Sequence, residues 1–330
     1  MKKHFWTKLM IVMGVLGLLL ALALVLGLST GAGQVDVAEF FRAASGGKDS
    51  MADAILYRIR LPRVLAAAFA GAALSLGGLV FQAILKNPLS EPYILGVSGG
   101  SAVGAILGIL AGFSRFPGVG GTAFTGSMAT LGLVVVLSSG RGAFTKEFLI
   151  LAGVMVNAFC SAFIMFLMSM TQDNKLHTIM FWLMGDLSSS DMGQFTILAC
   201  SVVPCFMVIT MMSHRMNLML LGRDKAESLG VDVKKTTLIL MIATSFMVSA
   251  TVCQCGLLGF VGLVIPHIFR LILGSDHRVL APACIIGGAS YLVFCDMTAR
   301  WLPSQGEIPV GVVTAMIGVP LFIILLRRKI

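Results

Sequence analysis

Three arginines stand close together in the segment Arg58-Ile59-Arg60-Leu61-Pro62-Arg63, directly before a long apolar run. A guanidinium group presents a planar fork of N–H donors that matches a carboxylate, so this cluster could bind acidic groups on a partner protein. Arginines at the end of an apolar helix also extend to the polar edge of a membrane. From the residues alone both roles stay open: docking of an acidic partner, or anchoring at the membrane surface.

His267 and the cysteines are the candidate metal ligands. His267 follows Pro266 inside an apolar run, and one residue separates Cys253 from Cys255. His267 has no second ligand at helical spacing, and the cysteine pair lacks the two-residue gap of zinc and redox motifs. We therefore expect His267 to pack or to form hydrogen bonds, and we expect neither a metal site nor a disulfide.

No group of residues points to an enzyme. The sequence contains no Gly-x-x-x-x-Gly-Lys-Ser/Thr phosphate loop, and no nucleophile with an adjacent base is recognisable. The chain is therefore predicted to hold no cofactor of its own and not to hydrolyse ATP itself.

The longest polar connection runs from His214 to Thr237. Within it, Asp224 and Glu227 have the spacing of a capping box, and Gly230 can end a helix in the left-handed conformation. This pattern predicts a short helix that is too short to be stable alone. We expect it to be ordered by packing on the rest of the chain or in the groove of a partner.

The elements that position these residues are apolar helices. The chain has 330 residues, of which 57% are hydrophobic and 12% charged, and its mean hydropathy is +0.96. Such a composition requires lipid as the solvent, and the long apolar runs lack the alternation of barrel strands. We predict one all-α domain, residues 1–330, with about ten membrane-spanning helices of roughly 20 residues each. The expected spans are 9–28, 64–85, 94–112, 122–137, 148–170, 195–212, 238–253, 257–273, 279–295 and 308–326.

The distribution of positive charge sets the expected orientation. The net charge is +9, but the excess lies on one side of the predicted membrane, so nucleic acid is not an expected partner. Of the 24 Lys and Arg residues, eight fall on the outer side: Arg42, Lys48, Arg58, Arg60, Arg63, Arg115, Lys175 and Arg300. The other 16 (24 minus 8) fall on the inner side, which predicts that both termini are cytoplasmic.

The first span has a rival interpretation, because three lysines precede it as in a secretory signal peptide. Its uninterrupted apolar length favours a retained helix.

Glycine and proline mark packing seams and breaks. Gly96, Gly100, Gly104 and Gly108 recur every four residues, a spacing that lets helices approach closely. We expect a packing seam there, with a pore lining as the alternative. Asn87 and Pro88 open a chain reversal, and three glycines before Pro266 predict a broken stretch in a protein-lined interior.

Several of these segments, in this order, resemble the permease family of iron–siderophore, haem and vitamin B12 ABC importers, the FecCD family. The resemblance covers about Tyr57 to Arg328. It rests on these motifs: Arg60-Leu61-Pro62-Arg63, Asn87-Pro88-Leu89 with Glu91-Pro92, Leu95-Gly96-Val97, Leu229-Gly230-Val231, Gly259-Phe260-Val261-Gly262-Leu263 with Pro266-His267, Asp276-His277-Arg278, and Pro309-Val310-Gly311 with Thr314.

The resemblance implies an assembly that works by alternating access. It would contain two permease copies, expected to be identical, two ATPase subunits that bind ATP, and one external substrate-binding protein. Arg60, Arg63 and Arg300 match the family's docking arginines. The short helix matches its ATPase coupling helix, with Asp224, Ala226, Glu227, Leu229, Gly230 and Val231. Pro266, His267, Pro309 and Gly311 fall in motifs that pack or line the pathway.

The cargo stays open. Siderophore-bound iron is the expected cargo, with haem and cobalamin as alternatives, and no residue separates them. An ion-coupled secondary transporter is the rival class, although the centres of the predicted spans hold few of the ionisable residues that such proteins use.

Overall fold

The computed structural model describes residues 2–30, 54–139, 146–303 and 306–327, and every regular element in them is a helix. This confirms the all-α prediction. Arg42 and Lys48, which the charge count places on the outer side, lie outside the described residues. The longer helices are α1 (Lys2–Ser29), α4 (Leu61–Ile84), α6 (Gly120–Ser139), α7 (Lys146–Ser169), α9 (Met192–Met211), α12 (Val233–Cys255), α14 (His277–Trp301) and α15 (Val310–Arg327). The shorter elements are η1 (Leu56–Arg60), α5 (Val97–Leu110), η2 (Arg115–Val119), α8 (Asp173–Leu183), α10 (Ser213–Met219), α11 (Arg223–Ser228) and α13 (Val261–Leu273).

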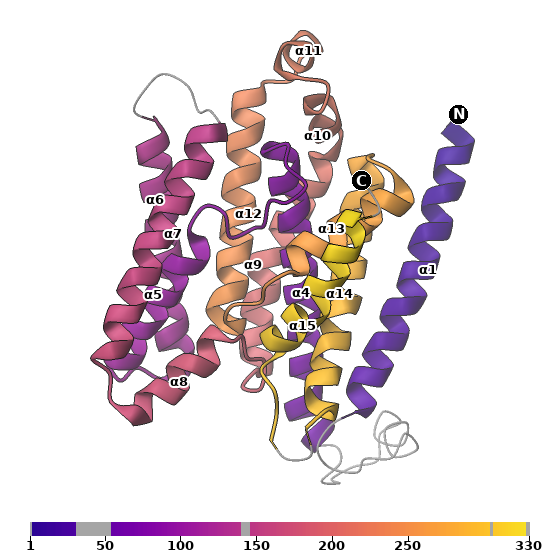
Figure 1. The fold of residues 1–330 in the computed structure, drawn as a ribbon. Coiled ribbons are helices and arrows are strands. Elements are labelled where there is room, and N and C mark those ends of the chain that lie inside the picture. Colours follow the sequence, from indigo (N-terminus) through magenta and orange to yellow (C-terminus); the bar gives the residue numbers. More distant parts are fainter. Residues whose placement is uncertain (1, 31–53, 140–145, 304–305, 328–330) are drawn as a thin grey trace.

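The long helices form a bundle with two distinct ends (Figure 1). At one end, here called the α11 end, lie the start of α1, helix α11 and the start of α12. At the other, here called the arginine end, lie the start of α4 and the ends of α1 and α14 (Figure 1). The predicted coupling segment and the predicted docking arginines therefore sit at opposite ends of the molecule.

Each of the ten predicted spans coincides with a helix, but not all of these helices are long enough to cross a membrane. Among the described residues, 7 helical stretches have the required length and hydropathy, and three apolar helices are shorter: Val97–Leu110, Val261–Leu273 and Val310–Leu325. With 14 residues, α5 is about 21 Å long at 1.5 Å per residue, less than the ~30 Å hydrocarbon core. The count of ten spans stays a prediction.

Two of the short helices begin late because the chain before them cannot be helical. Gly96 precedes α5 with a φ of +77°, and Phe260 precedes α13 with a φ of +67°. A left-handed residue ends regular α-helical geometry. The segments 86–96 and 256–260 therefore enter the bundle as irregular chain, as the glycines and prolines predicted.

Helix α4 is the centre of the bundle, as Figure 1 shows. In its most apolar window 89% of the residues are buried, against 6% in α1. Small residues allow this, because a Cβ at Gly71 would overlap the carbonyl oxygen of Gly288, and one at Gly78 would overlap that of Gly262. Helices α13 and α14 thus contact α4 backbone to backbone.

The glycine stripe lies mostly against α6. A Cβ at Gly100, Gly104 or Gly108 would overlap atoms of α6. Gly96 lies apart from this seam, next to Val156 of α7. The stripe thus contains three residues in one helix contact and a fourth that starts the helix.

Candidate functional site

A buried cluster of charged side chains lies at the arginine end. Arg63 Nε donates to Asp296 Oδ1 at 2.8 Å, and Arg63 Nη1 lies 2.6 Å from Glu307 Oε2. Arg300 Nη2 lies 3.0 Å from Asp296 Oδ2, with 4% of the Arg300 side chain exposed. Buried charges need such partners, because removing a charge from water costs several kcal/mol.

Two of the arginines also hold the end of α1. Arg60 Nη1 donates to the carbonyl oxygens of Leu28 and Ser29, at 3.0 and 3.1 Å. Arg300 donates to the carbonyls of Gly27 and Thr30. These are main-chain acceptors of the last turn of a helix, where cations are favoured by the helix dipole. The arginines therefore attach α1 to α4 and α14.

The structure thus brings the three predicted docking arginines together, but their side chains are largely enclosed. Arg60 is 3% exposed and Arg63 is 5% exposed, whereas Arg58 in the same motif is exposed. Counting Arg60, Arg63, Arg300, Asp296 and Glu307, three positive and two negative groups leave one positive charge. Glu307, with 38% of its side chain exposed, is the cluster's most accessible carboxylate.

The two irregular segments are joined inside the bundle. The Tyr93 hydroxyl donates to the carbonyl oxygen of Leu258 at 3.0 Å and accepts from the Leu258 amide at 3.3 Å. Asn87 accepts from the amide of Leu89 at 2.9 Å, which forms the tight turn predicted for Asn87 and Pro88. Tyr93 therefore fixes the position of one broken stretch against the other.

Pro309 precedes α15 and Gly311 is the second residue of that helix, at a point where three segments meet. A Cβ at Gly311 would overlap the carbonyl oxygen of Met184 and lie 2.8 Å from that of Leu257. The amide of Asp186 donates to the carbonyl of Cys255 at 2.9 Å. Pro309 accepts from the amide of Val312 at 3.1 Å, in the first turn of α15. Glycine at position 311 permits this close backbone approach.

His267 and Pro266 are buried in α13. The ring of His267 packs edge-on against Phe322 of α15, with centroids 5.6 Å apart. Among the described residues no three His, Cys, Asp or Glu side chains could hold a metal ion together. The packing contact matches the role expected for His267.

A hollow of about 400 Å³, lined more by apolar than by polar atoms, opens beside the first irregular segment. Its polar lining comes from Glu91, Tyr93 and Ser98, and from Asn157 in the middle of α7. Polar groups at the middle of an apolar helix are costly in lipid and mark functional positions.

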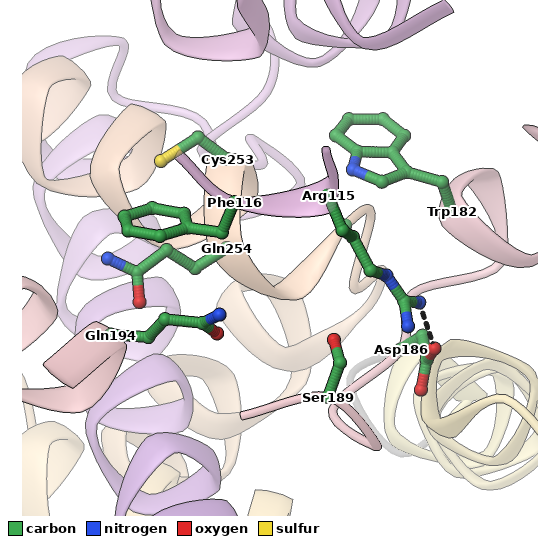
Figure 2. A pocket seen from close by; sticks show the side chains of 9 residues that line it. Arg115, Phe116, Trp182, Asp186, Ser189, Gln194, Cys253 and Gln254 are labelled. Atoms are coloured by element: carbon green, nitrogen blue, oxygen red, sulfur yellow. Dashed lines mark hydrogen bonds and ion pairs between the residues drawn. The ribbon is translucent and has the colours of Figure 1, made fainter. Parts of the chain in front are cut away.

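A second hollow lies at the arginine end, between η2, α8, the start of α9 and the end of α12 (Figure 2). Arg115 and Asp186 form an ion pair across it, as Figure 2 shows, and Trp182 lies next to Arg115. Burial opposes ionisation of Asp186, but hydrogen bonds from Ser188 and the charge of Arg115 outweigh it, so the pKa of Asp186 is lowered. The sequence analysis missed this hollow, because α8 is too polar to resemble a span and its partners are far apart in sequence.

The coupling segment projects at the α11 end. Ala226 and Val231 are buried and cluster with Met219 of α10, so they hold α11 on the bundle. Leu229 is 58% exposed and Leu221 is 55% exposed. The exposed side chains of this segment also include Asp224 and Glu227, and Gly230 is exposed beside them.

The capping-box interpretation of α11 is wrong. Gly222, with a φ of +105°, is the N-cap, and no side chain caps the helix. Glu227 instead pairs with Arg223 one turn earlier, at 2.9 Å. Gly230 follows the helix with a φ of +83°, as predicted for its stop, because a left-handed residue there satisfies the last carbonyls.

Comparison with known proteins gives matches over nearly the whole chain. Residues 19–328 match the model of the FecCD transport family. The uncharacterized ABC transporter permease protein YvrB of Bacillus subtilis is 37% identical, covering 94% of this chain and 91% of that protein. The vitamin B12 import system permease protein BtuC of Salmonella arizonae is 38% identical, covering 95% and 93%. A solved inward-facing metal-chelate type ABC transporter superposes with a TM-score of 0.87 at 33% identity, covering 96% and 98%.

Proposed function

The chain belongs to the FecCD transport family, and from that premise we propose that it is the permease subunit of an importer for an iron–siderophore complex or a related metal chelate. The observation that carries this is the likeness to the metal-chelate type transporter over 96% of the chain. Haem and cobalamin are the alternatives within the family. Of these two, cobalamin is supported by the similarity to a vitamin B12 permease. The protein is a multi-pass membrane protein and acts as a transport subunit.

The α11 end faces the cytoplasm in this proposal. The excess of Lys and Arg on that side supports it. The proposal places both termini inside and the arginine end outside, in the bacterial cytoplasmic membrane.

The cytoplasmic partner is an ATPase that contacts α11. Support comes from the division within the segment: Ala226 and Val231 face the bundle, whereas Leu229 is exposed. Exposed apolar side chains on a projecting element are suited to a groove in a partner. Each permease copy of a homodimer would engage one ATPase, which binds the ATP.

The external partner is an acidic substrate-binding protein that docks on the arginine end. The buried cluster carries one surplus positive charge, and the half-exposed Glu307 occupies part of the Arg63 guanidinium. A carboxylate of the partner would compete with Glu307 for this arginine. Docking then changes the contacts of Arg60, Arg63 and Arg300, and through them those of Asp296.

The cargo path runs along the hollow beside Glu91 and Asn157. Support comes from its open shape and from the polar side chains of Glu91, Tyr93, Ser98 and Asn157 within an otherwise mostly apolar lining. Movement of the segments that Tyr93 joins would open or close this hollow, in an alternating-access cycle.

The test is uptake by the reconstituted transporter. The permease is placed in liposomes with the ATPase and binding protein encoded beside it, and iron–siderophore, haem and cobalamin are each supplied with the binding protein. We expect uptake of one of the three that requires ATP and the binding protein. Uptake that follows an ion gradient and continues without ATP would show a secondary transporter instead.

A further inference from the structure

Helix α14 extends between the two ends of the molecule and carries polar contacts at both. Its 25 residues span about 37 Å at 1.5 Å per residue. It starts at the α11 end and finishes at the arginine end (Figure 1).

At the α11 end, Asn217 of α10 joins the first turn of α14. Its Nδ2 donates to Asp276 Oδ1 at 2.6 Å, and its Oδ1 accepts from the His277 amide at 2.8 Å. Asp276 is also held by Arg278, at 2.7 Å, and its pKa is lowered to about 2, chiefly by the hydrogen bond from Arg278. Asp276 is therefore charged at neutral pH, and a hydrogen bond to a charged group is a strong one.

Helix α10 in turn carries the coupling helix. Met219 of α10 packs with Ala226 and Val231, and only the three residues Leu220, Leu221 and Gly222 separate α10 from α11. A displacement of α11 therefore moves α10, and Asn217 passes that displacement to the start of α14.

At the arginine end, Asp296 of α14 is fully buried between Arg63 and Arg300. Between the two ends, Gly288 of α14 lies against the backbone of Gly71 in α4. Such close-packed helices move as rigid bodies and do not deform gradually. Arg63 lies on α4 and Arg300 on α14, so a shift of α14 that α4 follows keeps the ion pairs of Asp296. The same shift moves Arg300 against α1 and changes its contacts with the carbonyls of Gly27 and Thr30.

We propose that Asn217 is a positioning residue that couples the ATPase-contacting helix to the external arginine cluster through α14. The proposal rests on the function proposed above and deepens it by naming the connecting element. Helix α12 is the other continuation of the coupling segment, but it ends at Cys255 beside the irregular segment 256–260 and does not reach the arginine cluster.

The first test uses Asn217→Ala in the complete reconstituted transporter, with His214→Ala as the matched control, since His214 is an exposed residue of the same helix. The measurement is the ratio of ATPase rates with and without loaded binding protein. We expect Asn217→Ala to lower this ratio about tenfold, within the range for coupling between sites. Assembly with the ATPase and thermal stability should stay as in the control.

An unchanged ratio in Asn217→Ala would overturn the proposal. A parallel loss of assembly and stability would also overturn it, because Asn217 would then only support the fold. The wild-type complex is measured first: if the binding protein does not stimulate it, the proposed function fails, whatever Asn217 does.

The second test follows the far end of α14 directly. Leu302, just after α14, is exposed, and a Leu302→Cys reporter is labelled with an impermeant maleimide after the exposed Cys200 has been changed to Ser. We expect a non-hydrolysable ATP analogue to change the labelling rate of Leu302→Cys when Asn217 is present. When Asn217→Ala is added to the reporter, the analogue should leave the labelling rate unchanged. A rate that responds equally in both, or in neither, contradicts coupling through Asn217.

Discussion

The Arg63 guanidinium joins α4 to α14 by its hydrogen bond to Asp296, which is 233 positions away in the sequence. Both side chains are buried, so this ion pair lies inside the bundle and not on an exposed surface. A substitution at Arg63 will therefore affect folding before it affects docking, and the predictions below separate the two effects.

Arg63→Ala should destabilise the protein. It leaves the buried Asp296 with one cation in place of two, and removing one partner of a buried pair costs about 3 kcal/mol or more. Thermal unfolding in detergent measures the loss. Arg58→Ala, at an exposed position of the same motif, should change stability by no more than about 0.5 kcal/mol. Equal stability of the two variants would contradict the buried-cluster assignment.

Glu307→Gln should strengthen docking of the proposed acidic binding protein. It removes the carboxylate that competes for Arg63 and raises the surplus charge of the cluster by one. We expect the Kd of the binding protein to fall several-fold, and this gain in affinity to become smaller as salt is added. The Kd is measured by titrating labelled binding protein onto the permease in nanodiscs. Asp173→Asn, an exposed change of the same charge on α8, controls for net charge. Equal effects of both changes would count against a specific site.

Leu229→Asp should release the ATPase. Leu229 is exposed, so the change leaves the fold intact and puts a charge into the proposed groove. We expect the Kd for the ATPase to rise about tenfold, as for loss of an interface contact worth about 1.4 kcal/mol, and the ATPase to co-purify at a correspondingly lower yield. Ser228→Asp, at the neighbouring exposed position, is the control. Normal yield from Leu229→Asp would remove α11 from the interface.

Tyr93→Phe should weaken the link between the irregular segments. It removes the hydrogen bonds to Leu258 and leaves a carbonyl without its partner, which costs about 1–3 kcal/mol. We expect slower uptake and a lower unfolding temperature. Tyr57→Phe, at an exposed tyrosine, is the control and should match the wild type in uptake and unfolding temperature. Wild-type values for Tyr93→Phe would contradict a role for the link.

Gly78→Ala should prevent correct packing of α13 on α4. The added Cβ would overlap backbone atoms of Gly262, which cannot move aside as a side chain could. The measurement is the yield of folded protein by size-exclusion chromatography. Gly121→Ala is the matched control, because nothing lies within 4 Å of a Cβ there. A normal yield of Gly78→Ala would show that the two helices are farther apart.

Hydropathy predicted the helices well, because a run of apolar residues can be recognised in the sequence without knowledge of the fold. The left-handed position of Gly230 was also recognisable, since glycine is the residue that adopts it at least cost. Gly96, which was predicted to lie inside a helical span, is left-handed as well. Hydropathy could not show that α5 and α13 are too short to cross a membrane, because part of each apolar run continues as irregular chain.

The direction of polar side chains was not predictable from local sequence. The motif placed Arg60 and Arg63 at the end of a helix, but their partners are main-chain carbonyls of α1 and carboxylates at positions 296 and 307. Helices α8 and α10 were missed because they are short and mix polar with apolar residues. The role of Asn217 depends on a contact across 59 positions, which a single sequence does not reveal.

The attachment of α1 by Arg60 and Arg300 has a consequence for evolution. The guanidiniums bind main-chain oxygens, which every amino acid carries, and between Leu9 and Ser29 few side chains of α1 are enclosed by neighbouring helices. Outside Gly27, where Val64 and Val293 approach closely, the helix can exchange one apolar residue for another without losing its anchorage. Homologous chains should therefore diverge fastest along this segment while the two arginines that hold it persist.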